Sequence, residues 1–380
     1  MPEAYLVGAV RTPIGTRKGA LAGLHPADLA AHVLRELVTR TGVDPAAVDD
    51  VIMGCVNAMG AQAGCIARTA WLSAGLPESV PAVTIDRQCG SSQQALHFAA
   101  QAVMSGTQDL VVAAGVEHMA MVPIDVNRVV IESLGHTKYG RGWASRYGDQ
   151  EISQFRGAQL IAENWNLTRD DIERFALDSH RRAIAAIDGG RFTEQTVAIG
   201  SARLDEGPRR DTSAEKMAAL EPLRPGWRLT AAVASQLSIG AAALLVASEA
   251  AVRAHGLTPL ARVHALAVVG SDPVQMLTGP IPATSAVLKR AGLSIGDIDT
   301  FEINEAFAPV VLAWAQDTGA DLQRTNVNGG AIALGHPLGA TGAILATKLI
   351  YELRRTGGRY GLQAMCEGGG QANATVLERV

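Results

Sequence analysis

The chain has 380 residues, of which 48% are hydrophobic and 18% charged, and its formal net charge at pH 7 is −4. Such a balance excludes a broad basic surface, so nucleic acids and anionic membranes are not expected as bulk partners. The four cysteines form no Cys-x-x-Cys pair, which argues against a disulfide framework and against a structural zinc site. Forty glycines and this length favour a compact α/β protein of two or three packed units.

The beginning of the chain, residues 1–10, lacks the charged start and long apolar core of a secretory signal. The longest apolar stretch, Ile239 to Ala247, is under half of the roughly 20 residues that a membrane-spanning helix needs. We therefore expect a cytoplasmic protein with reduced thiols and no bound metal.

In chain order, apolar residues at helical spacing predict a helix over Leu29–Thr41, and the short segment Val48–Gly54 follows it. An apolar strand, Pro81–Ile85, then leads into an alanine-rich helix over Ser92–Met104, and another strand is expected at Asp109–Gly115. This alternation of helices and strands is typical of an α/β architecture.

The first half of this pattern recurs near the other end of the chain. A helical stretch over Ala283–Ala291 precedes the segment Ile298–Asn304, and three residue pairs match at one offset of 250: Gly42 and Gly292, Val48 and Ile298, Asp49 and Asp299. The strand ending at Gly115 matches the segment ending at Cys366 at an offset of 251. We interpret the chain as a duplication, in which two similar α/β halves pack face to face with their functional loops at the strand ends.

Residues 121–227 interrupt the repeat. This stretch contains a polar, glycine-rich segment from Gly135 to Gly148 and two predicted helices, Ser153–Trp165 and Thr168–Ile187. We predict a first half formed by residues 1–120 and 228–258, an inserted loop domain over residues 121–227 that contacts substrate, and a second half over residues 259–380.

Cys89 lies where the predicted strand meets the helix Ser92–Met104. The positive end of the helix dipole and the free N–H groups at this position favour a thiolate, so Cys89 is a candidate nucleophile. The alternative is a buried cysteine that acts only as a small apolar residue.

The segment Asn328–Gly342 contains five glycines and His336. Such a backbone approaches a ligand closely, and His336 is a candidate base; the alternative is a structural loop. A dinucleotide-binding loop is a weaker interpretation, because too few residues follow Gly342 to complete that unit.

Two further motifs follow predicted strands. Asn304 is placed to donate to a developing oxyanion, directly or through water, whereas Glu305 is a candidate base or a cap of the next helix. Cys366 precedes three glycines whose N–H groups suit an oxyanion hole, and its thiol is a candidate for proton transfer. Each motif taken alone is also compatible with a cap or a plain turn.

In this order the motifs resemble the four signatures of the thiolase family, and the resemblance covers essentially the whole chain. The segments concerned are Gln88–Ser92, Asn304–Ala308, Gly329–Gly342 and Cys366–Gly370. The resemblance implies a layered αβαβα fold of two duplicated halves with an inserted loop domain.

The resemblance also implies a reaction. Cys89 would attack the 3-keto carbon of a 3-oxoacyl-CoA while His336 accepts its proton, and Cys366 would protonate the departing acetyl-CoA enolate. A second CoA would then remove the acyl group from Cys89. One oxyanion would be bound by His336 with a water held by Asn304, and the other by the N–H groups of Cys89 and Gly368.

Arg209 and Ser235 match positions that contact CoA in the family. No cofactor other than CoA, itself a substrate, is implied, and a homodimer or homotetramer is expected. Three positions depart from the common family pattern: Asp86, Ile239 and Ala372. The motif that short-chain thiolases place near the acyl group is also missing, and the segments around Cys89 and Cys366 resemble most closely the actinobacterial thiolases of steroid breakdown. Bulky, possibly steroid-derived 3-oxoacyl-CoA esters are therefore the expected substrates of an acetyl-CoA C-acyltransferase.

Three alternatives stay open at the level of sequence. The same residues support a condensation that makes acetoacetyl-CoA, a catalytically silent CoA-ester binding protein, and a carrier-protein condensing enzyme. The intact set of Cys89, His336, Cys366 and Asn304 argues against the silent protein, and the second cysteine argues against the carrier-protein enzyme.

Overall fold

The structure, a computed structural model, describes residues 2–380. Its first part contains β1 (Ala4–Arg11), β2 (Gly15–Thr16), α1 (Pro26–Thr41), β3 (Asp50–Gly54), α2 (Ile66–Ser73), β4 (Ala82–Ile85), α3 (Ser91–Ser105) and β5 (Leu110–His118). The middle part contains α4 (Val126–Ser133), α5 (Arg141–Tyr147), α6 (Gln154–Asn164), α7 (Arg169–Asp188) and α8 (Ala214–Ala218). The last part contains β6 (Ser238–Ser248), α9 (Glu249–Ala254), β7 (Ala261–Gly270), α10 (Pro280–Ala291), β8 (Thr300–Ile303), α11 (Ala308–Thr318), α12 (Ala331–Leu334), α13 (Leu338–Thr356), β9 (Tyr360–Glu367) and β10 (Gln371–Arg379).

The strands follow the order β4-β3-β5-β6-β1-β7-β10-β9-β8, with β2 paired to β6. Within the first group β3 is parallel to β4 and β5, whereas β6 is antiparallel to β5 and β1; the second group repeats this with β8 parallel to β9 and with β10 antiparallel to β9 and β7. Two residue pairs, Tyr5 with Arg262 and Leu6 with Ala261, join the groups. The predicted α/β class is confirmed.

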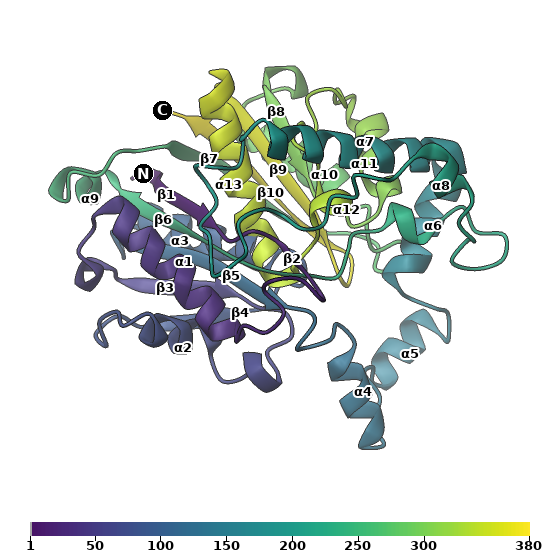
Figure 1. Cartoon of the computed structure of the whole chain (residues 1–380), viewed down its shortest axis with the longest axis horizontal. Coiled ribbons are helices and arrows are strands. Elements are labelled where there is room, and N and C mark those ends of the chain that lie inside the picture. The colour runs from purple at the N-terminus through teal and green to yellow at the C-terminus, as the bar shows by residue number, and fades with distance from the viewer. Residues whose placement is uncertain (1) are drawn as a thin grey trace.

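The hydrophobic core arranges the helices and strands in layers. One cluster packs α1 and α2 on the outer face of the first strand group, and another packs α10 and α11 on the outer face of the second. A third cluster joins α3 and α13 to the inner faces of both groups. The αβαβα order that the resemblance implied therefore describes this fold, and Figure 1 shows the purple and blue first half beside the yellow-green second half.

The duplication is visible in the hydrogen bonds. Gly42 and Gly292 both end a helix in the left-handed region, with φ of 68° and 69°. Asp49 Oδ2 accepts from the N–H groups at the start of β5, at 2.7 and 2.9 Å, and Asp299 Oδ2 accepts from those at the start of β9 at the same two distances. An aspartate thus fixes the same strand pair in each half.

The strand pairing corrects one detail of the predicted repeat. Asp50 pairs with Val111, and Thr300 pairs with Gly361, so the 250-residue offset continues through β5 and β9. Cys366 therefore corresponds to Val116 and not to Gly115, and the predicted offset of 251 is wrong by one residue. Gly115 suggested a strand end at that position, whereas it is a glycine because β5 packs tightly there against α3 and α13.

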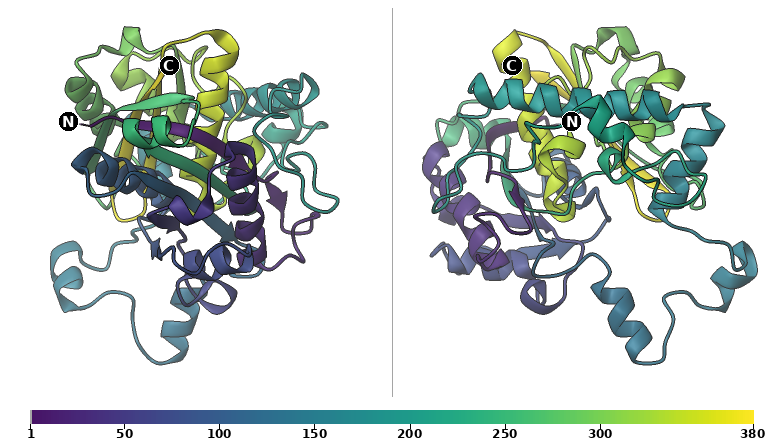
Figure 2. Two further views of the ribbon diagram at one scale, coloured as in Figure 1. Left: turned by 90° about the vertical axis from the view of Figure 1, so that its left-hand side faces the viewer. Right: turned by 45° about the vertical axis from the view of Figure 1, so that its right-hand side comes forward.

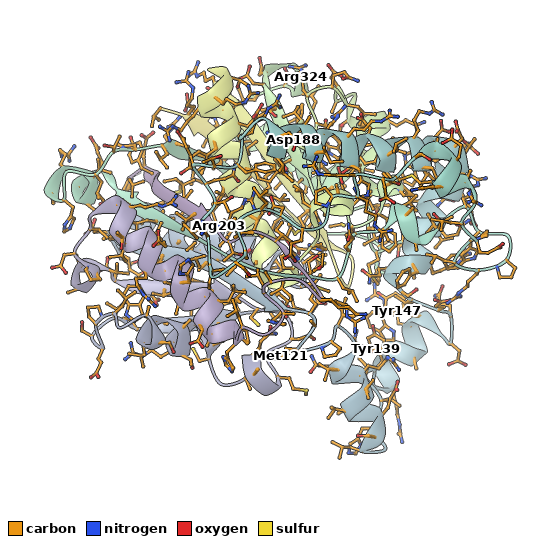
Figure 3. All side chains as sticks on the ribbon, in the orientation of Figure 1. Met121, Tyr139, Tyr147, Asp188, Arg203 and Arg324 are labelled. Carbon is orange, nitrogen blue, oxygen red and sulfur yellow. The ribbon has the colours of Figure 1, made fainter. Side chains whose placement is uncertain are left out.

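The inserted stretch contains the two predicted helices, now α6 and α7, and the capping box between Thr168 and Asp171 is present. The polar segment Gly135–Gly148, however, contains the helix α5, which we did not predict. Tyr139, Trp143 and Tyr147 stack at a spacing of four residues, and this aromatic stripe is the missed helical signal. Figures 2 and 3 show that α4 and α5 project from the body as an arm carrying Tyr139 and Tyr147.

The assignment of residues 121–227 to a separate loop domain remains a proposal, supported by the return of the chain to the first strand group through β6. In the part of the chain that the structure describes, no helix has both the length and the apolar character needed to cross a bilayer.

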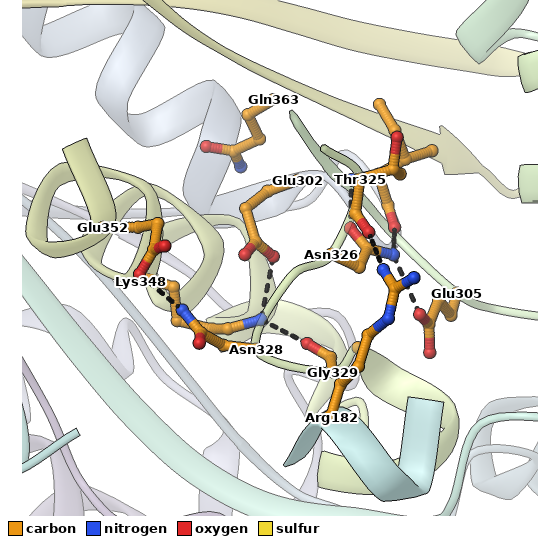
Figure 4. A network of polar contacts seen from close by, with 12 residues as sticks. Arg182, Glu302, Glu305, Thr325, Asn326, Asn328, Gly329, Lys348, Glu352 and Gln363 are labelled. Carbon is orange, nitrogen blue, oxygen red and sulfur yellow. Dashed lines mark hydrogen bonds and ion pairs between the residues drawn. The ribbon is translucent and has the colours of Figure 1, made fainter. Parts of the chain in front are cut away.

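A buried ion pair in the second half contacts the glycine-rich loop, residues 328–337. Lys348 Nζ, on α13, donates to Glu302 Oε2 on β8 at 2.8 Å and to the carbonyl of Gly329 at 2.7 Å. Both charged side chains are almost fully buried, with 1% and 2% exposure. Figure 4 shows this pair beside the carboxylates of Glu305 and Glu352. The strand that precedes Asn304 and the loop that precedes His336 are thereby held at one point.

Lys348→Met should destabilise the fold by about 3–5 kcal/mol, because it leaves the Glu302 carboxylate buried without its cation. Burial already raises the pKa of Glu302 to about 7, and the lysine opposes this shift. The midpoint of urea unfolding measures the loss. The double variant Lys348→Met with Glu302→Gln, which removes both charges, should recover part of it, and equal stability of the single and double variants would contradict this account.

Candidate active site

Two helix N-termini meet where the halves join. The first turn of α3 touches the second turn of α13: the N–H of Ala343 donates to Ser92 Oγ at 2.9 Å, and any side chain at Gly342 would place its Cβ 2.1 Å from the Gln93 nitrogen. Cys89 stands just before α3, and His336 just before α13. Because both helix dipoles present their positive ends here, the region favours developing negative charge.

The turn that presents Cys89 is held by local hydrogen bonds. Gln88 has a positive φ of 49°, an uncommon conformation for a residue with a side chain. Asp86 Oδ1 accepts from the Gln88 N–H at 2.6 Å, and the Ser91 hydroxyl donates to the Gln88 carbonyl at 2.6 Å. Asp86, one of the departures from the family pattern, thus stabilises the turn that carries the nucleophile candidate.

The ionisation of Cys89 differs from our expectation. We predicted a favoured thiolate, but burial and the neighbouring Glu367 carboxylate raise the pKa of the Cys89 thiol to about 12. The N–H groups of Cys89 and Gly368 act in the opposite direction and only partly offset this. The free protein therefore holds Cys89 as a thiol, and the helix dipole does not outweigh desolvation.

Cys366 lies at the end of β9 and is fully buried. Burial raises its pKa well above that of a free thiol, and charge on Cys89 raises it further, so the two sulfurs lie close enough to influence each other. Gly368, two residues on, lies against the Gln88 side chain, where a Cβ would stand 2.8 Å from Gln88 Oε1. The fold thus brings Cys89, Cys366 and Gly368 together from opposite halves.

His336 is buried in a single defined orientation. The Thr341 hydroxyl has one proton, and it donates that proton to the Pro337 carbonyl at 2.8 Å. At 2.6 Å from His336 Nδ1, the Thr341 oxygen must therefore accept from the ring, which assigns the proton to Nδ1 and leaves Nε2 unprotonated. Burial lowers the pKa of His336 to about 4, so the imidazole stays neutral at physiological pH and Nε2 is available as a base.

Asn304 lies beside this base. Its Nδ2 stands 3.3 Å from His336 Nε2, and its buried Oδ1 receives no hydrogen bond from any side chain or backbone group among residues 2–380. The amide therefore has an acceptor available for a water molecule next to His336. Asn304 directly follows β8 and His336 lies in the loop before α13, and the Lys348 contacts hold this strand and this loop together.

Glu305 has a structural part that we did not predict. It does not cap α11, whose N-cap is Phe307. Its buried carboxylate accepts from Ser179 Oγ at 2.7 Å, from Asn326 Nδ2 at 2.9 Å and from the Ile332 N–H at 3.1 Å. The residue braces the glycine-rich loop against α7. The predicted role as a cap of the following helix is wrong, whereas the role as a base stays a prediction.

Arg209 and Ser235 line two adjoining cavities. Arg209 lines the first together with His180 and Lys216, and Ser235 lines the second together with His336 and Phe307. Ala231, Ala234 and Gln236 belong to both cavities, which therefore share a wall. An extended ligand could run from the basic mouth at Arg209 to His336. The other departures from the family pattern, Ile239 and Ala372, are buried in β6 and β10.

Sequence reasoning missed Thr341 and Glu117. Thr341 was visible only as a hydroxyl five residues after His336. Glu117 is buried in β5 and accepts from the backbone of Val56, Asn57 and Gly339 and from Gln62 Nε2. It therefore anchors the start of α13, next to His336, to the other half of the molecule.

The comparisons with known proteins agree with this geometry. The family model described as "Thiolase, N-terminal domain" matches residues 4–250, and the one described as "Thiolase, C-terminal domain" matches residues 257–379. The chain is 60% identical to the steroid 3-ketoacyl-CoA thiolase FadA6 of Mycobacterium tuberculosis, covering 100% of this chain and 95% of the relative. It is 42% identical to the beta-ketoadipyl-CoA thiolase of Escherichia coli, with full coverage of both.

Solved structures give the same result. The human mitochondrial 3-ketoacyl-CoA thiolase in complex with CoA has a TM-score of 0.90 and 34% identity, covering 100% of this chain and 98% of its own. The Bacillus anthracis acetyl-CoA acetyltransferase has a TM-score of 0.89 and 37% identity, covering 100% and 99%. The chain belongs to the thiolase family and is an acyltransferase of 3-ketoacyl-CoA thiolase type.

Thr341→Val should lower turnover by about tenfold or more, because it removes the acceptor that holds the His336 proton on Nδ1. Thr341→Ser keeps the hydroxyl and is the matched control. Steady-state rates with a 3-oxoacyl-CoA would show the effect mainly in kcat. Retention of full activity by the valine variant would contradict the assigned tautomer.

Proposed function

We propose that the protein cleaves a bulky 3-oxoacyl-CoA with CoA, giving acetyl-CoA and a shortened acyl-CoA through an acyl group carried on Cys89. The observation that supports this most strongly is the arrangement at the two helix N-termini, where two thiols and one neutral imidazole lie in a region that favours negative charge. Cleavage next to a ketone needs this combination, because a tetrahedral oxyanion and an enolate form in turn.

Each residue has a proposed part in the reaction. His336 accepts the Cys89 proton through Nε2 as the sulfur attacks the keto carbon, so a nucleophile whose pKa is high in the free protein needs no standing thiolate. Cys366 gives a proton to the departing enolate. The N–H groups of Cys89 and Gly368 stabilise one oxyanion, and His336 with a water held by Asn304 stabilises the other.

CoA is the proposed second substrate and no other cofactor is needed. We assign the phosphate-bearing end of CoA to the mouth lined by Arg209 and Lys216, and the thiol-bearing chain to the cavity lined by Ser235. The charge of the two cations suits the phosphates. The complex of the human relative with CoA supports the choice of ligand.

The size of the acyl group is the finer part of the proposal. The cavity at His336 is lined mainly by apolar side chains: Met119, Ile124, Phe155, Leu223, Leu237, Phe307 and Leu338. Such a lining favours a large apolar acyl chain over a two-carbon unit. The printed name of the 60% identical relative, a steroid 3-ketoacyl-CoA thiolase, points to the same class of substrate.

Condensation to acetoacetyl-CoA uses the same residues in reverse and is the second candidate, supported by the likeness to an acetyl-CoA acetyltransferase. Assembly into a homodimer or homotetramer stays a prediction.

CoA-dependent consumption of a polycyclic 3-oxoacyl-CoA and of acetoacetyl-CoA, measured side by side, tests the substrate class. We expect kcat/KM to favour the polycyclic ester by at least about tenfold, a difference of roughly 1.4 kcal/mol in transition-state binding. Activity confined to acetoacetyl-CoA would reject the proposed class in favour of the short-chain reaction. Cys89→Ala is the control, and it should be inactive with both esters.

A further inference from the structure

A carboxyl group with no assigned function lies beside the two thiols. Glu367 directly follows Cys366 at the end of β9, and its side chain is fully buried. Its carboxyl group lies against the Cα of Gly90, since a Cβ at that position would stand 1.9 Å from Glu367 Oε1. Gly90 is the residue between Cys89 and the first turn of α3. Glu367 therefore contacts the backbone that carries Cys89.

The internal duplication gives Glu367 a counterpart in the first half, with which its contacts can be compared. With the offset of 250 fixed by the strand pairing, Glu367 corresponds to Glu117. The Glu117 carboxylate lies in the same way against Gly339 in the first turn of α13, where a Cβ would stand 2.8 Å from Glu117 Oε2. Each half thus sends one glutamate to the helix start of the other half.

The two glutamates differ in their hydrogen bonds. Glu117 accepts from four donors at 2.8 to 3.2 Å, so its carboxylate is a structural anchor. Neither oxygen of Glu367 accepts a hydrogen bond from any side chain among residues 2–380, and its one approaching donor is the backbone N–H of Asn373, which forms no hydrogen bond of normal geometry. Arg87 Nε nearby is likewise without an acceptor. Arg87 uses Nη1 to bind Gln371 Oε1 at 2.9 Å instead. A buried carboxyl group so weakly held by donors contributes little to stability and is free to change its protonation state.

The charged and titratable groups around Glu367 come from two elements. Arg87 and Asp86 precede α3, Cys89 lies between them and that helix, and Cys366 is its neighbour on β9. Burial raises the pKa of Glu367 to about 8, with Asp86 adding to the rise and with Arg87 and the N–H of Asn373 opposing it. The carboxyl group is therefore neutral below about pH 8 and ionised above it.

We propose that Glu367 is a positioning residue that acts through Cys89: protonated, it leaves the forming thiolate unopposed, and ionised, it opposes that thiolate across Gly90. The inference rests on the proposed function of Cys89 as the nucleophile. The charge on Glu367 then sets how readily the Cys89 thiolate forms. Ionisation of Glu367 lowers the reactivity of Cys89 at alkaline pH, an effect that neither the second cysteine nor His336 supplies.

The pH dependence of Cys89 alkylation tests the proposal directly. Iodoacetamide reacts with the thiolate, and mass spectrometry of the Cys89 peptide measures its rate between pH 6.5 and 9.5. Glu367→Gln keeps the shape and removes the charge. The ratio of variant to wild-type rates should be close to one at pH 6.5 and rise to about three- to tenfold at pH 9.5, which corresponds to half to one pKa unit in Cys89.

A second variant changes the pH at which ionised Glu367 begins to slow the alkylation. Arg87→Met removes the cation that favours ionised Glu367, so its alkylation rate should begin to fall behind that of Glu367→Gln at a higher pH than the wild-type rate does. Glu117→Gln is the matched control: it should lower the unfolding midpoint, because a four-donor anchor is lost, but its alkylation ratio should not change with pH.

A ratio for Glu367→Gln that is constant over the whole pH range would overturn the proposal, since a purely structural contact alters the rate equally at every pH. The proposal would also be overturned if this onset pH were the same in Arg87→Met as in the wild-type protein. Failure of the proposed function can be told apart from failure of the Glu367 proposal. Turnover by Cys89→Ala would show that Cys89 is not the nucleophile, but it would leave the pH dependence of Cys89 alkylation unchanged.

Discussion

The close contact between the N-terminal ends of α3 and α13 holds the two halves of the molecule, and with them the site, in place. It is possible because Gly342 has no side chain to strike Gln93, and because Ser92 accepts a hydrogen bond from the opposing helix. Once the two turns touch, Cys89 and His336 are fixed relative to each other, although they lie far apart in the sequence. Both helix dipoles then act on one region.

Burial at this contact explains the ionisation of the site. The same close packing that joins the halves buries Cys366 and His336 and leaves Cys89 half-buried, so both thiols stay protonated and the imidazole stays neutral. A site of this kind stores no charge before the substrate arrives. Charge appears during the reaction, where helix N-termini and backbone N–H groups are already in place to stabilise it.

Much of this was predictable from the sequence, because it depends on local patterns. Helical spacing located α1, α3 and α7, and the repeated Gly42 and Asp49 motifs exposed the duplication. The remaining features depend on contacts between distant segments. Thr341 assigns the His336 tautomer only when the turn is folded, and Glu305 binds α7 rather than its own helix. Desolvation outweighs the helix dipole at Cys89 only once the two halves have packed together.

The two thiols divide the proposed reaction, with Cys89 carrying the acyl group and Cys366 moving a proton. Intact-mass spectrometry of Cys366→Ala after mixing with a short acyl-CoA, together with its turnover of a 3-oxoacyl-CoA, tests this most directly. We expect the variant to gain the acyl mass on Cys89 while cleavage falls by at least about 10²-fold. An acyl group found on Cys366 in the wild-type protein, or full cleavage activity in the variant, would contradict it.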